Sequence, residues 1–133
     1  MQRKSIVPIS AALLFAVIFP FQGHAQSVTA MPTAAEISTL PPYCQARLNR
    51  DGDAEKLWRQ RMGHKNYVHI HHYCYGLAFM TRAMGTFDQT LSRRMYGRAV
   101  GEFDYVLQRW DPSFPLYQEA ETQKALAEVL SRR

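Results

Sequence analysis

The sequence has few cysteines and lacks the short motifs that mark the common enzyme classes. Its 133 residues include two cysteines, and no Cys-x-x-Cys-His segment for haem attachment occurs. It also lacks a Gly-x-Ser-x-Gly nucleophile elbow, a glycine-rich phosphate loop and a dinucleotide-binding fingerprint. Glu102 and Asp104 lie two residues apart in a predicted helix, so they point away from each other and are not expected to form a catalytic pair. We therefore expect a protein that is not an enzyme and has no cofactor.

No segment alternates apolar and polar residues with the period of two that a half-buried strand requires. Apolar residues instead recur at spacings of three and four, most clearly at Tyr96, Ala99, Val100, Phe103, Val106, Leu107 and Trp110. This spacing is that of an amphipathic helix. We expect residues 42–133 to form one all-α domain with about five helices.

Turn and capping residues predict the bounds of these helices. We expect helices over residues 42–48, 54–62, 65–84, 87–110 and 115–131. Asp53 is expected to cap the second of them. Thr86, with Gln89 three residues later, is expected to form a capping box for the fourth.

The first 25 residues have the three parts of a secretory signal peptide. Arg3 and Lys4 supply a positive start, Ile6–Phe21 an apolar run, and Gly23 and Ala25 the small residues at a cleavage site. We expect cleavage after Ala25, a periplasmic or secreted protein, and contact with a membrane only before cleavage. An uncleaved anchor is the alternative, but a span needs about 20 apolar residues and this run is shorter and interrupted by prolines.

Residues 26–41 are rich in Ser, Thr and Pro and have little apolar periodicity, so we expect a flexible leader there, with order beginning near Leu40. Both Cys44 and Cys74 follow the predicted cleavage site and would enter an oxidising compartment. We therefore expect a disulfide between them, which by loop length would stabilise the fold by roughly 3.5 kcal/mol. The disulfide would clamp the first helix of the domain to the third.

The formal net charge is +5, and Arg93, Arg94 and Arg98 form a local basic cluster. A solvated helix face accounts for these arginines. In an exported protein a nucleic acid is not the expected partner.

One short segment of the third predicted helix holds three of the chain's five histidines. His69 and His72 are three residues apart, as are His71 and Cys74, so each pair shares a helix face. With His64 or Cys44 these side chains could bind zinc or copper. A disulfide-bonded Cys74 cannot be a ligand, however, so we expect His71 and Cys74 to face the core. A periplasmic metal-binding protein remains the alternative function.

The third and fourth predicted helices resemble the two helices of a tetratricopeptide repeat. The first helix of such a repeat carries glycine and aromatic positions, and the second carries an Ala-x-x-x-Phe pattern followed by a small apolar residue. The matching residues are Tyr75, Gly76, Phe79, Ala99, Phe103 and Val106. The distance of 23 residues from Gly76 to Ala99 is longer than the repeat allows, so the resemblance is to an irregular repeat.

Together with the segments Leu40–Cys44 and Glu102–Leu107, this pattern is similar to a group of uncharacterised bacterial envelope proteins with tetratricopeptide-like helices. The resemblance implies no reaction. It implies a non-enzymatic adaptor of the cell envelope that presents a groove to an unidentified protein or peptide, and it allows a homo-oligomer.

Overall fold

A computed structural model of the protein describes residues 31–133, which form helices and connecting turns without a β-strand. The helices of this described part are α1 (Ala34–Thr39), α2 (Pro42–Asn49), α3 (Gly52–Met62), α4 (His64–Tyr67), α5 (Ile70–Gly85), α6 (Gln89–Leu107) and α7 (Tyr117–Ser131). The predicted all-α class is confirmed, with seven helices among the described residues where about five were expected. The predicted signal peptide and the first residues of the leader lie outside the described residues.

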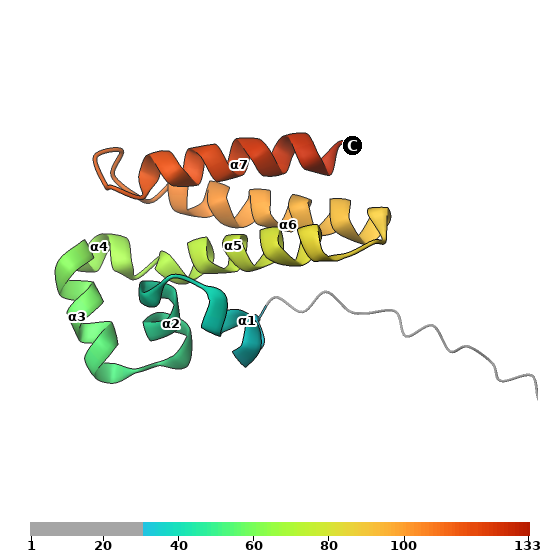
Figure 1. Ribbon diagram of the computed structural model, residues 1–133. Helices are drawn as coiled ribbons and strands as arrows, with labels where there is room; N and C mark the ends of the chain where they lie inside the picture. The colour runs from blue at the N-terminus through green and yellow to red at the C-terminus, as the bar shows by residue number, and fades with distance from the viewer. Residues whose placement is uncertain (1–30) are drawn as a thin grey trace, which may run out of the picture.

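The three long helices α5, α6 and α7 lie side by side in chain order, and α1 to α4 pack on the side of α5 away from α7 (Figure 1). The core lies among the three long helices and continues to the contact of α2 with α5. Its largest fully buried side chains are Tyr67, Tyr73, Phe79, Phe103, Ile70 and Val106. The predicted apolar face of α6 points into this core, since Ala99, Phe103 and Val106 are fully buried. This face contacts both α5 and α7.

The expected leader is wrong for its last part, because order begins before Leu40. Thr33 caps α1 in a capping box with Glu36, and each of the two residues bonds the other's backbone amide. Ile37 and Leu40 are buried. Arg82 of α5 holds Glu36 from across the fold, with its Nη2 atom 2.8 Å from Oε2 of Glu36.

The expected helix over residues 65–84 is divided into α4 and α5. The break lies at Val68 and His69. In a continuous helix the Asn66 carbonyl would accept a hydrogen bond from the amide of Ile70, but here it accepts from the amide of His69 at 3.2 Å and from the indole nitrogen of Trp110 at 3.0 Å. The contact between Trp110 and Asn66 therefore accompanies the end of α4, and α5 starts afresh at Ile70.

Two predicted helix caps are displaced by two residues along the chain. Asp51, not Asp53, caps α3 by accepting a hydrogen bond from the Ala54 amide at 3.3 Å. Asp88, not Thr86, caps α6 and accepts from two backbone amides of its first turn. In both places the aspartate that directly precedes the first helical residue supplies the side-chain acceptor.

The predicted disulfide is present between Cys44 of α2 and Cys74 of α5, with their Cα atoms 5.6 Å apart. Both cysteines are fully buried. The bond joins the layer of short helices to the long helices at the centre of the molecule. It closes a loop with a sequence separation of 30.

We predict that the Glu36–Arg82 pair stabilises the fold in a pH-dependent way. The hydrogen bond from Arg82 is the main cause that holds the pKa of Glu36 at about 2, below its ordinary value of 4.5. Because the folded-state pKa is the lower one, the stabilisation is complete above about pH 4.5 and is lost as the pH falls toward 2. We expect Glu36→Gln to reduce the free energy of unfolding by about 1 kcal/mol at pH 7, since the pair is partly exposed to solvent.

Urea denaturation at pH 7 and at pH 2.5 measures this effect. The Glu36→Gln variant should approach the wild type at the lower pH. Glu121→Gln, which removes an exposed carboxylate of α7, is the matched control and should change stability little at either pH. A Glu36→Gln deficit that is equal at both pH values would contradict the ionic origin of the effect.

Candidate functional site

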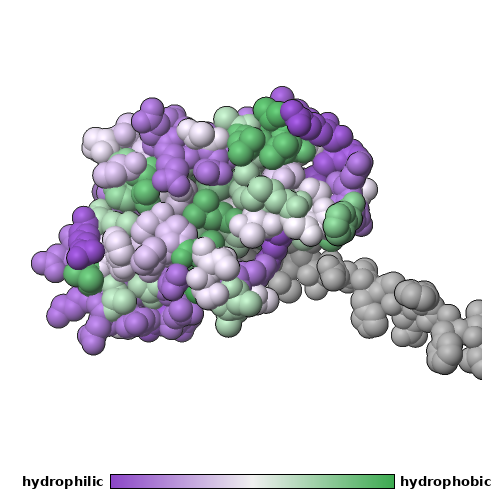
Figure 2. All heavy atoms as spheres, viewed as in Figure 1, coloured by the Kyte–Doolittle hydropathy of each residue, from purple (hydrophilic) through white to green (hydrophobic). Residues whose placement is uncertain are grey.

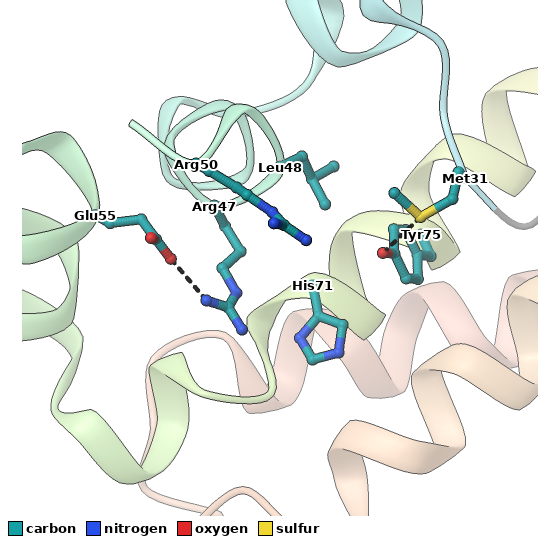
Figure 3. Close-up of a pocket in the computed structure, with 7 residues that line it drawn as sticks. All are labelled: Met31, Arg47, Leu48, Arg50, Glu55, His71 and Tyr75. Carbon is teal, nitrogen blue, oxygen red and sulfur yellow. Dashed lines mark hydrogen bonds and ion pairs between the residues drawn. The ribbon is translucent and has the colours of Figure 1, made fainter. Parts of the chain in front are cut away.

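A pocket of about 380 Å³ opens between α2 and α5 near the disulfide. We call it the basic pocket. It is lined by Met31, Arg47, Leu48, Arg50, Glu55, His71 and Tyr75. Figure 3 shows side chains of α2 and α5 facing each other across it, with the arginines on one side and His71 and Tyr75 on the other.

The two arginines of the basic pocket differ in their partners. Arg47 forms an ion pair with Glu55, with Nη1 and Oε1 2.7 Å apart. Arg50 follows the last residue of α2 and adopts the left-handed backbone conformation, with φ of 55°. Within the described part of the chain the Arg50 side chain makes no hydrogen bond or ion pair, and it is exposed. The pocket therefore carries one guanidinium that is not neutralised by a contacting carboxylate.

His71 forms the buried side of the basic pocket. Burial is the main cause that lowers its pKa to about 4, and the nearby charges of His72 and Arg47 lower it further. The ring is therefore neutral at pH 7. Its Nδ1 atom is buried without a hydrogen-bond partner among the described residues. The Val68 backbone makes a hydrogen-bonding contact with the ring that acts to raise its pKa, as expected for a histidine that satisfies a backbone carbonyl, although Nδ1 makes no hydrogen bond of good geometry.

Tyr75 lies on the same side of the basic pocket as His71, also on α5. Its hydroxyl donates to the sulfur of Met31 at 3.1 Å. Burial raises the pKa of Tyr75 above its ordinary value, so the hydroxyl stays protonated. Thioether sulfur is a weak acceptor, and a stronger acceptor that entered the pocket could take this hydrogen bond.

The remaining histidines of the cluster are held by other contacts. Nδ1 of His72 lies 2.7 Å from Oε2 of Glu102, and its ring stacks on Tyr105 with centroids 3.6 Å apart. His69 packs edge-on against Tyr105. His64 is exposed at the start of α4.

The structure does not assemble the predicted metal ligands. Among residues 31–133, no group of three or more His, Cys, Asp or Glu side chains is placed to hold a metal ion. Cys74 is in the disulfide and Nδ1 of His72 is engaged by Glu102. The geometry of the described residues therefore offers no support for the zinc or copper alternative.

The residues matched to the repeat pattern lie mainly in the core. Gly76, Phe79, Ala99, Phe103 and Val106 are buried. A β-carbon added at Gly76 would lie 2.5 to 2.9 Å from three carbons of the Phe103 ring, so a glycine is needed where α5 and α6 meet. Tyr75, the remaining member, lines the basic pocket.

A second surface lies at the opposite end of the long helices, where the α5–α6 turn meets the C-terminal end of α7 (Figure 1). We call it the apolar end. A groove of about 230 Å³ there is lined by Thr86, Gln89, Ser92, Arg93, Tyr96, Leu130 and Arg133. Exposed apolar side chains flank this groove in sequence, at Met84, Phe87, Leu126 and Val129. Figure 2 shows hydrophobic surface over the C-terminal half of α7.

Sequence reasoning missed the main residues of both surfaces. Phe87 has a relative exposure of 103 %, and an apolar residue at the junction of a predicted turn and a predicted helix could have indicated it. Arg47 follows Cys44 by one helical turn and His71 precedes Cys74 by one turn. Arg47 and His71 thus each lie one turn from a cysteine of the predicted disulfide, and this could have indicated that their side chains lie near each other.

Comparisons of the chain with known protein families, with curated proteins and with solved structures found no match. No helix among the described residues is both long and apolar enough to cross a membrane.

Proposed function

We propose that the protein is a non-enzymatic helical adaptor of the bacterial cell envelope and that its apolar end binds an acidic, amphipathic segment of a partner protein. The observation that carries the proposal is the complete exposure of Phe87 beside a groove between α6 and α7. A large aromatic side chain exposed beside other apolar residues is typical of a protein-interaction surface.

The charge of the groove supports an acidic partner. Arg93 and Arg133 line it. The nearest carboxylates in sequence are already engaged, because Asp88 caps α6 and Glu128 lies 3.9 Å from Nζ of Lys124. A partner helix or peptide with apolar residues on one face and carboxylates at its edge would match both the apolar side chains and the arginines.

Export to the periplasm or outside the cell is part of the proposal. The signal-like N-terminus supports it, and a buried disulfide suits an oxidising compartment. The tetratricopeptide-like pattern supports an adaptor role, because such helical pairs bind peptides and proteins in grooves.

Site-specific photo-cross-linking in the producing cell tests the proposal. A photoreactive phenylalanine analogue at position 87 should give an adduct with another protein, because this position would lie in the interface. The same analogue at Gln60, which is exposed on α3 at the other end of the molecule (Figure 1), is the matched control and should give little adduct.

Mass spectrometry of the adduct then identifies the cross-linked segment. An acidic segment with apolar residues on one face would support the proposal. Equal yields at positions 87 and 60, or an adduct at position 87 that contains only a second copy of this chain, would contradict it.

A further inference from the structure

The basic pocket shares no lining residue with the groove of the apolar end and is not used by the proposed adaptor function. We propose that it is a binding site for a small organic anion, in which a carboxylate or phosphate head contacts Arg50, Arg47 and Tyr75 and a short apolar body contacts Leu48. Four features of the described residues carry this inference.

The first feature is an excess of positive charge. Arg47 is paired with Glu55, so the guanidinium of Arg50 remains to balance the charge of a ligand. Figure 3 shows the Arg50 side chain extending over the space above His71, toward Tyr75. Guanidinium groups present several donors in one plane, a geometry that suits the oxygens of carboxylates and phosphates.

The second feature is the set of polar groups with unused or weakly used hydrogen-bonding capacity. Nδ1 of His71 is buried and makes no hydrogen bond of good geometry, the ring's one backbone contact being with Val68, and the Tyr75 hydroxyl donates to a sulfur atom. Buried polar atoms in native proteins are ordinarily satisfied, so an unsatisfied one beside a pocket indicates a missing partner. An oxygen-rich ligand would supply it.

The third feature is the shape and apolar part of the pocket. A volume of about 380 Å³ lies within the range of small-molecule sites. Leu48 and Met31 also line it, so a ligand with some apolar surface fits better than a bare inorganic ion.

The fourth feature is that the disulfide holds the two sides of the pocket. Arg47 lies one turn after Cys44 on α2, and His71 lies one turn before Cys74 on α5. The spacing between the arginine side and the histidine side is therefore set by a covalent bond. Such preorganisation lowers the cost of binding.

Isothermal titration of the purified protein, expressed from the full chain with its disulfide intact, tests this inference. Phenyl phosphate and benzoate are the two anionic probes, and benzyl alcohol is the uncharged probe of similar shape. We expect saturable binding of at least one anion with a stoichiometry of one. Binding of both anions supports an oxyanion site in general, and binding of only one identifies the head group that the site prefers.

Substitutions locate the binding. Arg50→Asn removes the charge with a residue that tolerates a left-handed backbone, and it should weaken binding about tenfold. Arg50→Lys, which keeps the charge, should retain most of the affinity. Arg94→Gln makes the same charge change at an exposed position of α6. It is the matched control and should leave binding unchanged. Circular dichroism of each variant confirms folding.

Three results would overturn the inference. They are the absence of saturable binding by either anion, equal binding of benzyl alcohol, and an Arg94→Gln effect as large as that of Arg50→Asn. None of these depends on the partner proposed for the apolar end, so this site and the adaptor function can fail separately.

Discussion

Replacing Cys44 and Cys74 together by alanine is expected to reduce the free energy of unfolding by about 3.5 kcal/mol. The disulfide closes a loop with a sequence separation of 30, and removing it frees that loop in the unfolded chain. Alanine also leaves small voids, because both sulfur atoms are fully buried. A domain of this size has a total stability of only about 5 to 15 kcal/mol, so the change should be large.

Chemical denaturation of the double variant and of the oxidised wild type measures this loss. The reduced wild type is the matched control, because it lacks the bond and keeps both sulfur atoms. We expect reduced wild type and double variant to unfold at similar denaturant concentrations, both well below the oxidised protein. A double variant as stable as the oxidised wild type would show that the packing of α2 against α5 does not need the bond.

Replacing Gly76 by alanine is expected to destabilise the protein by about 2 kcal/mol. The added β-carbon would meet the ring of Phe103 at 2.5 Å. That ring is fully buried and packs against Tyr73, with ring centroids 5.7 Å apart, so it has little room to move. The usual gain of about 1 kcal/mol from removing a helix glycine is outweighed by this overlap.

Gly97 is the matched control for Gly76. It also lies inside a long helix, but no neighbouring atom lies within 4 Å of a β-carbon built there. Thermal and denaturant unfolding should show that Gly97→Ala is neutral or slightly stabilising. In addition, Phe103→Leu should cost less stability in the Gly76→Ala background than in the wild type, because the smaller side chain relieves the overlap. Additive effects would mean that Gly76 and Phe103 are not in contact.

Local sequence patterns predicted the parts of the fold that depend on local physics. The three-and-four spacing of Ala99, Phe103 and Val106 correctly indicated the buried face of α6. The pairing of Cys44 with Cys74 followed from their number and the predicted compartment. The expected end of the second helix at residue 62 was also correct, and Gly63, which follows it, has a positive φ of 79°.

Other parts depend on contacts between residues far apart in the chain. The short helix α1 is held by Arg82, which is 46 residues away from Glu36. The division of α4 from α5 involves Trp110, which is 44 residues away from Asn66. Helical periodicity carries no information about such contacts, so the sequence predicted a leader in the first place and an uninterrupted helix in the second.

The candidate sites were harder to predict than the helices. The histidines were candidate metal ligands because they lie close together in the sequence. In the fold, however, His71 lines the basic pocket and His72 contacts Glu102. Arg50 stood in a predicted break between helices and Phe87 at the predicted start of one, where no periodic pattern marks a residue as important. Their positions become informative only once the neighbouring helices are placed.

The yield of the cross-linked adduct at position 87 in charge-reversed backgrounds tests the central claim most directly. The double substitution Arg93→Glu and Arg133→Glu reverses the charge of the groove at the apolar end. The control double substitution Arg59→Glu and Arg61→Glu makes the same charge change at exposed positions of α3. If the apolar end binds an acidic segment, the first pair of substitutions should abolish most of the adduct and the second pair should preserve it. An adduct that persists in both backgrounds, or that is lost equally in both, would contradict the account.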